Sequence, residues 1–159
     1  MQDKGESLYR RSLYTFWKRT APPPSMTTFD APNRESYCLR RERSNTPLQA
    51  LNLMNDVQFF EAARNFAQNL ITQHPSTDSR ITAAFRSVAS RYPSAQEAEL
   101  IRSTLDQHLA AYKAKPDSAK QAITYGESKP NEKLDPAELA AWTLVCNLLL
   151  NLDEMVTRG

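Results

Sequence analysis

The sequence predicts an all-α protein, a helical bundle of about five to seven helices that follows an extended segment rich in proline and arginine. Among its 159 residues are three glycines and ten prolines. Half of the prolines lie in the first third of the chain, which predicts an extended front. Behind it, apolar residues recur at helical spacing after well-marked helix starts. The change falls near Asn45 and divides one domain into residues 1–45 and a helical body of residues 46–159.

The front segment contains one expected helix. Four apolar residues stand at positions i, i+4, i+7 and i+8: Tyr9, Leu13, Phe16 and Trp17. This spacing predicts a short amphipathic helix, although the aromatic content also suits a strand. The three consecutive prolines 22–24 are expected to end the helix, because each proline ring removes a backbone donor. Residues 25–42 are then expected to form an ordered loop.

Three later helix starts carry capping signals, each worth about 1 kcal/mol. Residues 46–49 (Thr-Pro-Leu-Gln) combine an N-cap hydroxyl, a proline at the first helical position and a glutamine three residues past the cap. Residues 94–97 (Ser-Ala-Gln-Glu) form a capping box, and residues 135–138 (Asp-Pro-Ala-Glu) combine both devices. Asp56 either caps a further helix or lies inside one helix that continues from Pro47.

Apolar stripes at helical spacing mark the core faces of the helical body. The stripes are Phe59, Ala63, Phe66, Ala67 and Leu70; Ile81, Ala84, Phe85 and Val88; and Ala98, Ile101, Leu105, Leu109 and Tyr112. Residues 117–125 are expected to form a short helix closed by Gly126. Residues 139–150 are apolar on nearly every side, which predicts the central helix of the bundle.

Positive charge gathers at the front, where residues 1–43 hold nine Lys or Arg against five Asp or Glu. Guanidinium groups pair with carboxylates and phosphates, so this region can bind an anion or act as a scaffold between domains. The carboxylates nearby favour the scaffold. The small charge excess argues against nucleic acid, which requires about six or more phosphate contacts. The candidate anion-binding or interdomain residues are Arg10, Arg11, Lys18, Arg19, Asp30, Arg34, Arg40, Arg41 and Arg43.

No catalytic, cofactor or metal constellation is visible in the sequence. His74 and His108 have no cysteine or second histidine at ligand spacing, and no nucleophile stands beside a histidine and a carboxylate. Cys38 and Cys146 fit no metal or haem-attachment spacing; Cys146 is expected to be buried, and a disulfide between the two stays open. An export signal is not seen, and no apolar run is long enough to predict membrane insertion.

Several strings along the chain resemble one known family. They are residues 8–20, 22–26, 28–32, Arg41 with 43–51, 54–56, 60–64, 91–93, 138–142 and 150–154. These strings are similar to the C-terminal portion of the planctomycete-specific domain family, also called domain of unknown function 1553. Family members usually carry threonine where Ser44 stands.

The resemblance implies that the chain is a C-terminal fragment of a larger exported bacterial protein, located in the periplasm or cell envelope. In such proteins this region follows a second uncharacterised domain and often a cytochrome c-like domain, so any haem would belong to that separate domain and none to this fragment. The upstream domains would be its partners.

The resemblance brings no catalytic residues, and the sequence leaves enzyme activity and the oligomeric state open. We expect an accessory or structural module whose arginine-rich loop is an interdomain scaffold. The alternative is part of an enzyme or ligand-binding site, completed by the upstream domain, for an acidic or carbohydrate ligand of the cell envelope.

Overall fold

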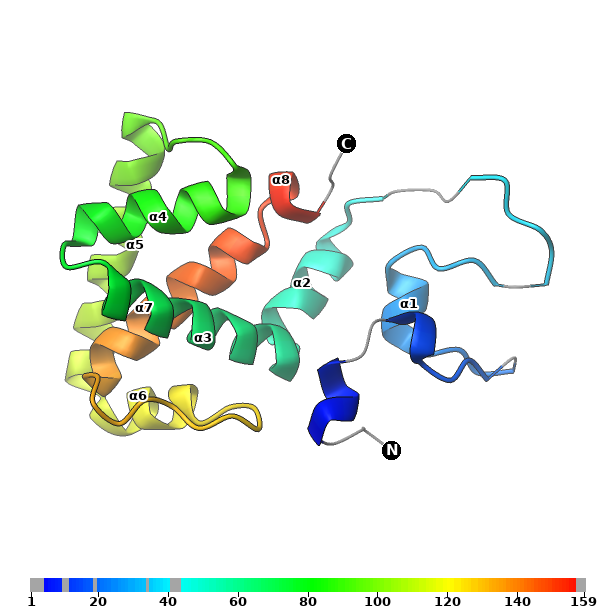
Figure 1. Ribbon diagram of the computed structural model, residues 1–159, viewed down its shortest axis with the longest axis horizontal. Helices are drawn as coiled ribbons and strands as arrows, with labels where there is room; N and C mark the ends of the chain where they lie inside the picture. The colour runs from blue at the N-terminus through cyan, green and yellow to red at the C-terminus, as the bar shows by residue number, and fades with distance from the viewer. Residues whose placement is uncertain (1–4, 10–11, 19, 34, 41–43, 157–159) are drawn as a thin grey trace. The chain divides into compact units, whose positions relative to one another are not determined.

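A computed structural model describes residues 5–9, 12–18, 20–33, 35–40 and 44–156. Over these ranges the chain contains helices and no strand, which confirms the all-α prediction (Figure 1). The α-helices are α1 (Pro24–Thr28), α2 (Pro47–Asn55), α3 (Val57–Gln73), α4 (Thr77–Ala89), α5 (Ala95–Ala114), α6 (Pro116–Ile123), α7 (Pro136–Leu150) and α8 (Asp153–Val156). Six of them have at least eight residues, within the expected range for the bundle.

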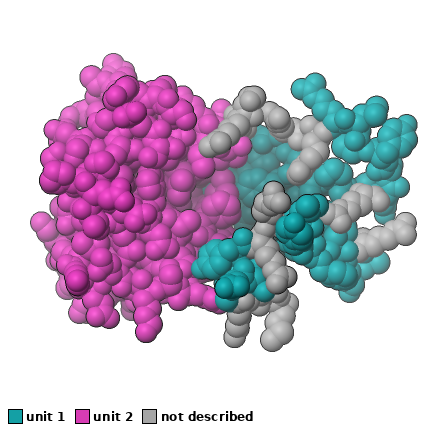
Figure 2. Space-filling model, in the orientation of Figure 1, with its two compact units in different colours: residues 1–52 teal, residues 53–159 magenta. Residues whose placement is uncertain are grey.

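The chain forms two compact units, Met1–Asn52 and Leu53–Gly159, which we call unit 1 and unit 2 (Figure 2). The division falls inside α2. The sequence boundary at Asn45 lies before that helix, where the proline-rich segment gives way to the first capping signal.

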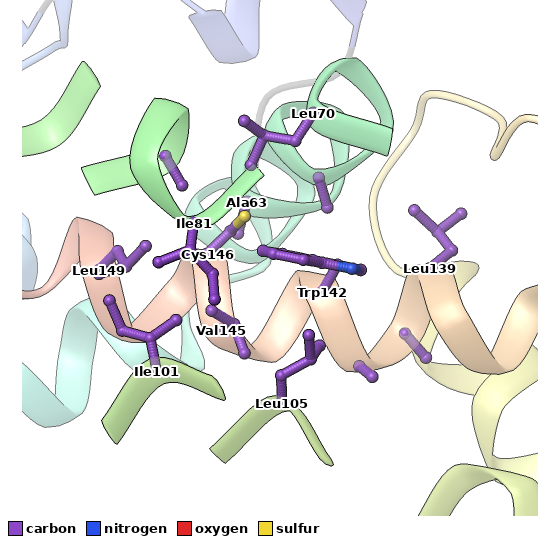
Figure 3. Packing of buried hydrophobic residues seen from close by; sticks show 14 of the residues in the cluster. Ala63, Leu70, Ile81, Ile101, Leu105, Leu139, Trp142, Val145, Cys146 and Leu149 are labelled. Carbon is purple, nitrogen blue, oxygen red and sulfur yellow. The ribbon is translucent and has the colours of Figure 1, made fainter. Parts of the chain in front are cut away.

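Helix α7 is the central helix of unit 2, as predicted. Ten of its fifteen residues are buried, and it packs against α3, α5 and α6. Figure 3 shows side chains of α7 among those of neighbouring helices, including Ala63, Leu70, Ile81, Ile101 and Leu105. Trp142 is the largest of the fully buried side chains. Because α7 is covered on several sides, it needs apolar residues around most of its circumference rather than on one stripe.

The capping signals act as the sequence predicts. Thr46 accepts a hydrogen bond from the Gln49 backbone N–H at 3.3 Å, and the Gln49 side chain accepts one from the Thr46 N–H at 2.9 Å. Ser94 and Glu97 form the same reciprocal pair at the start of α5. At the start of α7, Asp135 accepts from the backbone N–H three residues on, at 2.8 Å.

Asp56 caps a separate helix, which decides between the two alternatives for this residue. Its Oδ1 accepts hydrogen bonds from the backbone N–H groups of Gln58, at 2.8 Å, and Phe59, at 3.3 Å.

The predicted stripes of α3, α4 and α5 face the core, and all four stripe residues of α4 are buried. Phe59 is the exception: it lies in the first turn of α3 and is exposed.

The helix predicted from Tyr9 to Trp17 is wrong. The described residues there form two short 3-10 helices, Gly5–Tyr9 and Ser12–Tyr14, and Trp17 lies beyond both. An isolated short helix is stable only when its apolar face is buried, and in this segment Leu13 and Phe16 are exposed. The loop expected over residues 25–42 also needs correction.

That loop begins with the short helix α1, whose first residue is Pro24. A proline at the first helical position costs no hydrogen bond, since that N–H has no partner within a helix. The hydroxyl groups of Thr27 and Thr28 both donate to the Pro24 carbonyl, which closes the turn. The third of three prolines therefore starts a helix here.

Arg91 links three parts of unit 2. Its guanidinium donates two hydrogen bonds to the Glu97 carboxylate, at 2.7 and 2.9 Å, and a third to Glu154 of α8, at 2.9 Å. It also lies over the Phe85 ring, 4.8 Å from the ring centroid. The guanidinium thus ties α8 to the start of α5 and to the core face of α4.

This arrangement predicts a pH dependence of stability. Hydrogen bonds lower the pKa of Glu97 from 4.5 to about 2, those from the Arg91 side chain most and the one from the Ser94 backbone N–H next. The unfolded chain therefore binds this proton more readily, so the stabilisation is complete above pH 4.5 and is lost as the pH falls towards 2. We expect Glu97→Gln to flatten the fall of the thermal midpoint in that range, measured by circular dichroism.

The matched control for this measurement is Glu132→Gln. Glu132 is exposed and has no ion pair among the described residues, so its removal is expected to leave the acid slope unchanged. If the thermal midpoint falls equally steeply with pH in Glu97→Gln and in the unsubstituted chain, the role of Arg91 is contradicted.

Candidate functional site

Only three of the candidate anion-binding or interdomain residues lie in the described part of the chain. Those outside it are Arg10, Arg11, Arg19, Arg34, Arg41 and Arg43. Lys18 and Arg40 are exposed, whereas Asp30 is half-buried. The role of the cationic set stays a prediction, and the geometry that can be followed is that around Asp30.

Asp30 lies at a sharp corner of the chain just after α1. Its φ is +55°, a left-handed conformation that aspartate tolerates better than most residues. Its Oδ2 accepts hydrogen bonds from the Ser44 backbone N–H, at 2.9 Å, and from the Ser44 hydroxyl, at 2.7 Å. The two ends of the loop between these residues are therefore held together by one carboxylate oxygen.

Gln49 of α2 completes this network from the other side. Its amide nitrogen donates to the Thr28 carbonyl at 2.8 Å and to the Ser44 hydroxyl at 2.9 Å, and lies 3.4 Å from the Asp30 Oδ2. Its amide oxygen accepts from the Thr46 N–H. The side chain is 1% exposed and all its hydrogen-bonding groups have partners, as a buried amide requires.

We call these residues, Thr28, Asp30, Ser44, Thr46 and Gln49, the loop lock. The sequence predicted the Thr46 and Gln49 cap and placed Asp30 in the candidate set. It did not predict that the Gln49 amide serves both the cap and the Asp30 corner. The Asp30 carboxylate accepts hydrogen bonds from both the Ser44 hydroxyl and the Ser44 backbone N–H, so the geometry of the lock fixes the backbone shape of the loop.

The loop lock predicts that Gln49→Met will release residues 28–46. The substitution keeps the length of the side chain but removes the donors to Thr28 and Ser44. A lost buried hydrogen bond costs about 1–3 kcal/mol, so we expect the Ser44 amide hydrogen to exchange about tenfold faster or more, measured by NMR. Gln73→Met, at an exposed position of α3, is the control. Unchanged exchange at Ser44 would contradict the lock.

The described part of unit 1 buries no large apolar side chain, and Gln49 is its only buried residue. Trp17, Met26 and Phe29 are half-buried, and other large apolar side chains of unit 1 are exposed. We call the following residues the exposed apolar set: Tyr9, Leu13, Tyr14, Phe16, Tyr37 and Leu39. The polar loop lock therefore shapes a segment whose described residues build no hydrophobic core of their own.

Unit 2 contains a buried ion pair to which the sequence analysis assigned no role. Arg64 of α3 is 0% exposed and donates to three backbone carbonyls at and beyond the end of α6: Ile123 at 2.7 Å, Tyr125 at 3.0 Å and Ser128 at 2.7 Å. These carbonyls lie about 60 positions away in sequence. The sequence signal was available in the placement of two charges, Glu61 and Arg64, beside Ala63 and Ala67.

Glu61, one turn before Arg64, binds the same loop through its carboxylate. It accepts hydrogen bonds from the backbone N–H groups of Glu127, at 3.1 Å, and Ser128, at 2.7 Å, and from the Ser128 hydroxyl. The Arg64 Nη2 and the Glu61 Oε1 are 3.7 Å apart. Together the two side chains satisfy, in place of water, the backbone hydrogen-bonding groups of the turn around Gly126. This is a structural role.

The cysteines and histidines form no site in the described residues. Cys146 is buried, as predicted, and burial raises the pKa of its thiol. Cys38 is exposed, and both cysteines are free in this structure. His74 is the C-cap residue of α3. Within the described ranges, no three His, Cys, Asp or Glu side chains gather where they can hold a metal ion.

Each helix in the described part of the chain is too short or too polar to span a lipid bilayer.

Comparison with known proteins identifies the family. The family model PSD1, a protein of unknown function (DUF1553), matches residues 1–105. No curated protein and no solved structure matches the chain. The matched residues include the whole loop lock and the Glu61 and Arg64 pair, and they end in α5. Since the match covers more than half of the chain, the protein belongs to the PSD1 family of unknown function (DUF1553).

Proposed function

We propose that the chain is an accessory, non-catalytic module of a larger exported protein, and that unit 1 attaches it to the other domains of that protein. The observation that carries this proposal is the exposed apolar set. Contiguous exposed apolar patches commonly bind a partner, and in this proposal the exposed apolar set supplies such a patch when unit 1 docks. A segment without its own core can gain apolar burial from another domain.

The loop lock supports the same role. A docking segment that is disordered until it binds must lose conformational entropy on binding, which weakens the association. The described residues of unit 1 form no apolar core that would limit this cost, but the hydrogen bonds among Asp30, Ser44 and Gln49 close its loop in advance. A polar network of this kind gives the segment a fixed shape while leaving its apolar side chains available.

The cationic residues extend the proposal to the interdomain scaffold. Lys18 and Arg40 are exposed and would pair with carboxylates of the neighbouring domain. The resemblance to exported family members supports a location in the periplasm or cell envelope. In the same proposal this fragment carries no cofactor, and any haem belongs to a separate domain of the parent protein.

Thiol labelling of Cys38 tests the docking role, because this residue lies between the exposed Tyr37 and Leu39. We expect a maleimide to label Cys38 at least about tenfold more slowly in the full-length parent protein than in the isolated chain, measured by peptide mass spectrometry. Buried Cys146 is the internal control and should react in both only after unfolding. Equal labelling rates at Cys38 would overturn the proposal.

A further inference from the structure

We draw no further inference here: the strongest candidate, the row of exposed apolar side chains along α2 formed by Leu48, Leu51 and Met54, carries no proposal because nothing in the structure shows what covers it.

Discussion

Gly126→Ala is expected to destabilise unit 2 by about 2–5 kcal/mol. Gly126 has a φ of +95°, and a Cβ added there would overlap the Glu61 carboxylate. The left-handed backbone costs a residue with a side chain about 1–2 kcal/mol. Displacing the Glu61 carboxylate from its backbone partners adds about 1–3 kcal/mol. The free energy of unfolding in urea measures the effect.

Gly5→Ala is the control for this substitution. Gly5 also has a positive φ, of +60°, but nothing lies within 4 Å of an added Cβ. This variant is expected to carry only the backbone cost, about 1–2 kcal/mol or less. If the two variants lower stability equally, the contact with Glu61 does not explain the glycine at position 126.

Arg64→Met is expected to destabilise unit 2 by about 3–5 kcal/mol, because it leaves the buried Glu61 carboxylate without its cation. The substitution also removes the donors to the carbonyls of Ile123, Tyr125 and Ser128. Methionine fills a similar volume, so the cost arises from the lost polar partners rather than from a cavity. Chemical unfolding followed by circular dichroism measures it.

A double-mutant cycle separates the ion pair from the loop contacts. In a Glu61→Gln background, Arg64→Met no longer leaves a buried charge unpaired. The loss of unfolding free energy caused by Arg64→Met should therefore be much smaller there than in the unsubstituted chain. Arg102→Met provides a surface control, since Arg102 pairs with Asp78 at an exposed position and is expected to contribute little. If Arg64→Met destabilises the protein as little as Arg102→Met does, the role of the buried pair is contradicted.

Features set by neighbouring residues were predictable from sequence. The caps at Thr46, Ser94 and Asp135 follow from side chains that bond to a backbone group three residues on. The apolar residues on nearly every side of α7 predicted its central position in the bundle. Such signals need only the helical period and local hydrogen bonding, which the sequence contains directly.

Features set by distant residues were not predictable. The Glu61 and Arg64 pair binds a loop more than 55 positions away, and its sequence signal is only two charges beside Ala63 and Ala67. The helix predicted over Tyr9 to Trp17 failed for a related reason. Its spacing was helical, but spacing does not reveal whether another surface is present to bury the apolar face.

Hydrogen exchange in the proposed full-length parent protein tests the central proposal, that unit 1 is a preshaped docking segment. In the isolated chain we expect the amides of residues 12–18 and 36–40 to exchange rapidly and the Ser44 amide, bonded to Asp30, to be protected. In the parent protein the first two segments should exchange at least about tenfold more slowly, with Ser44 still protected. Equal exchange of these segments in both proteins would contradict the claim.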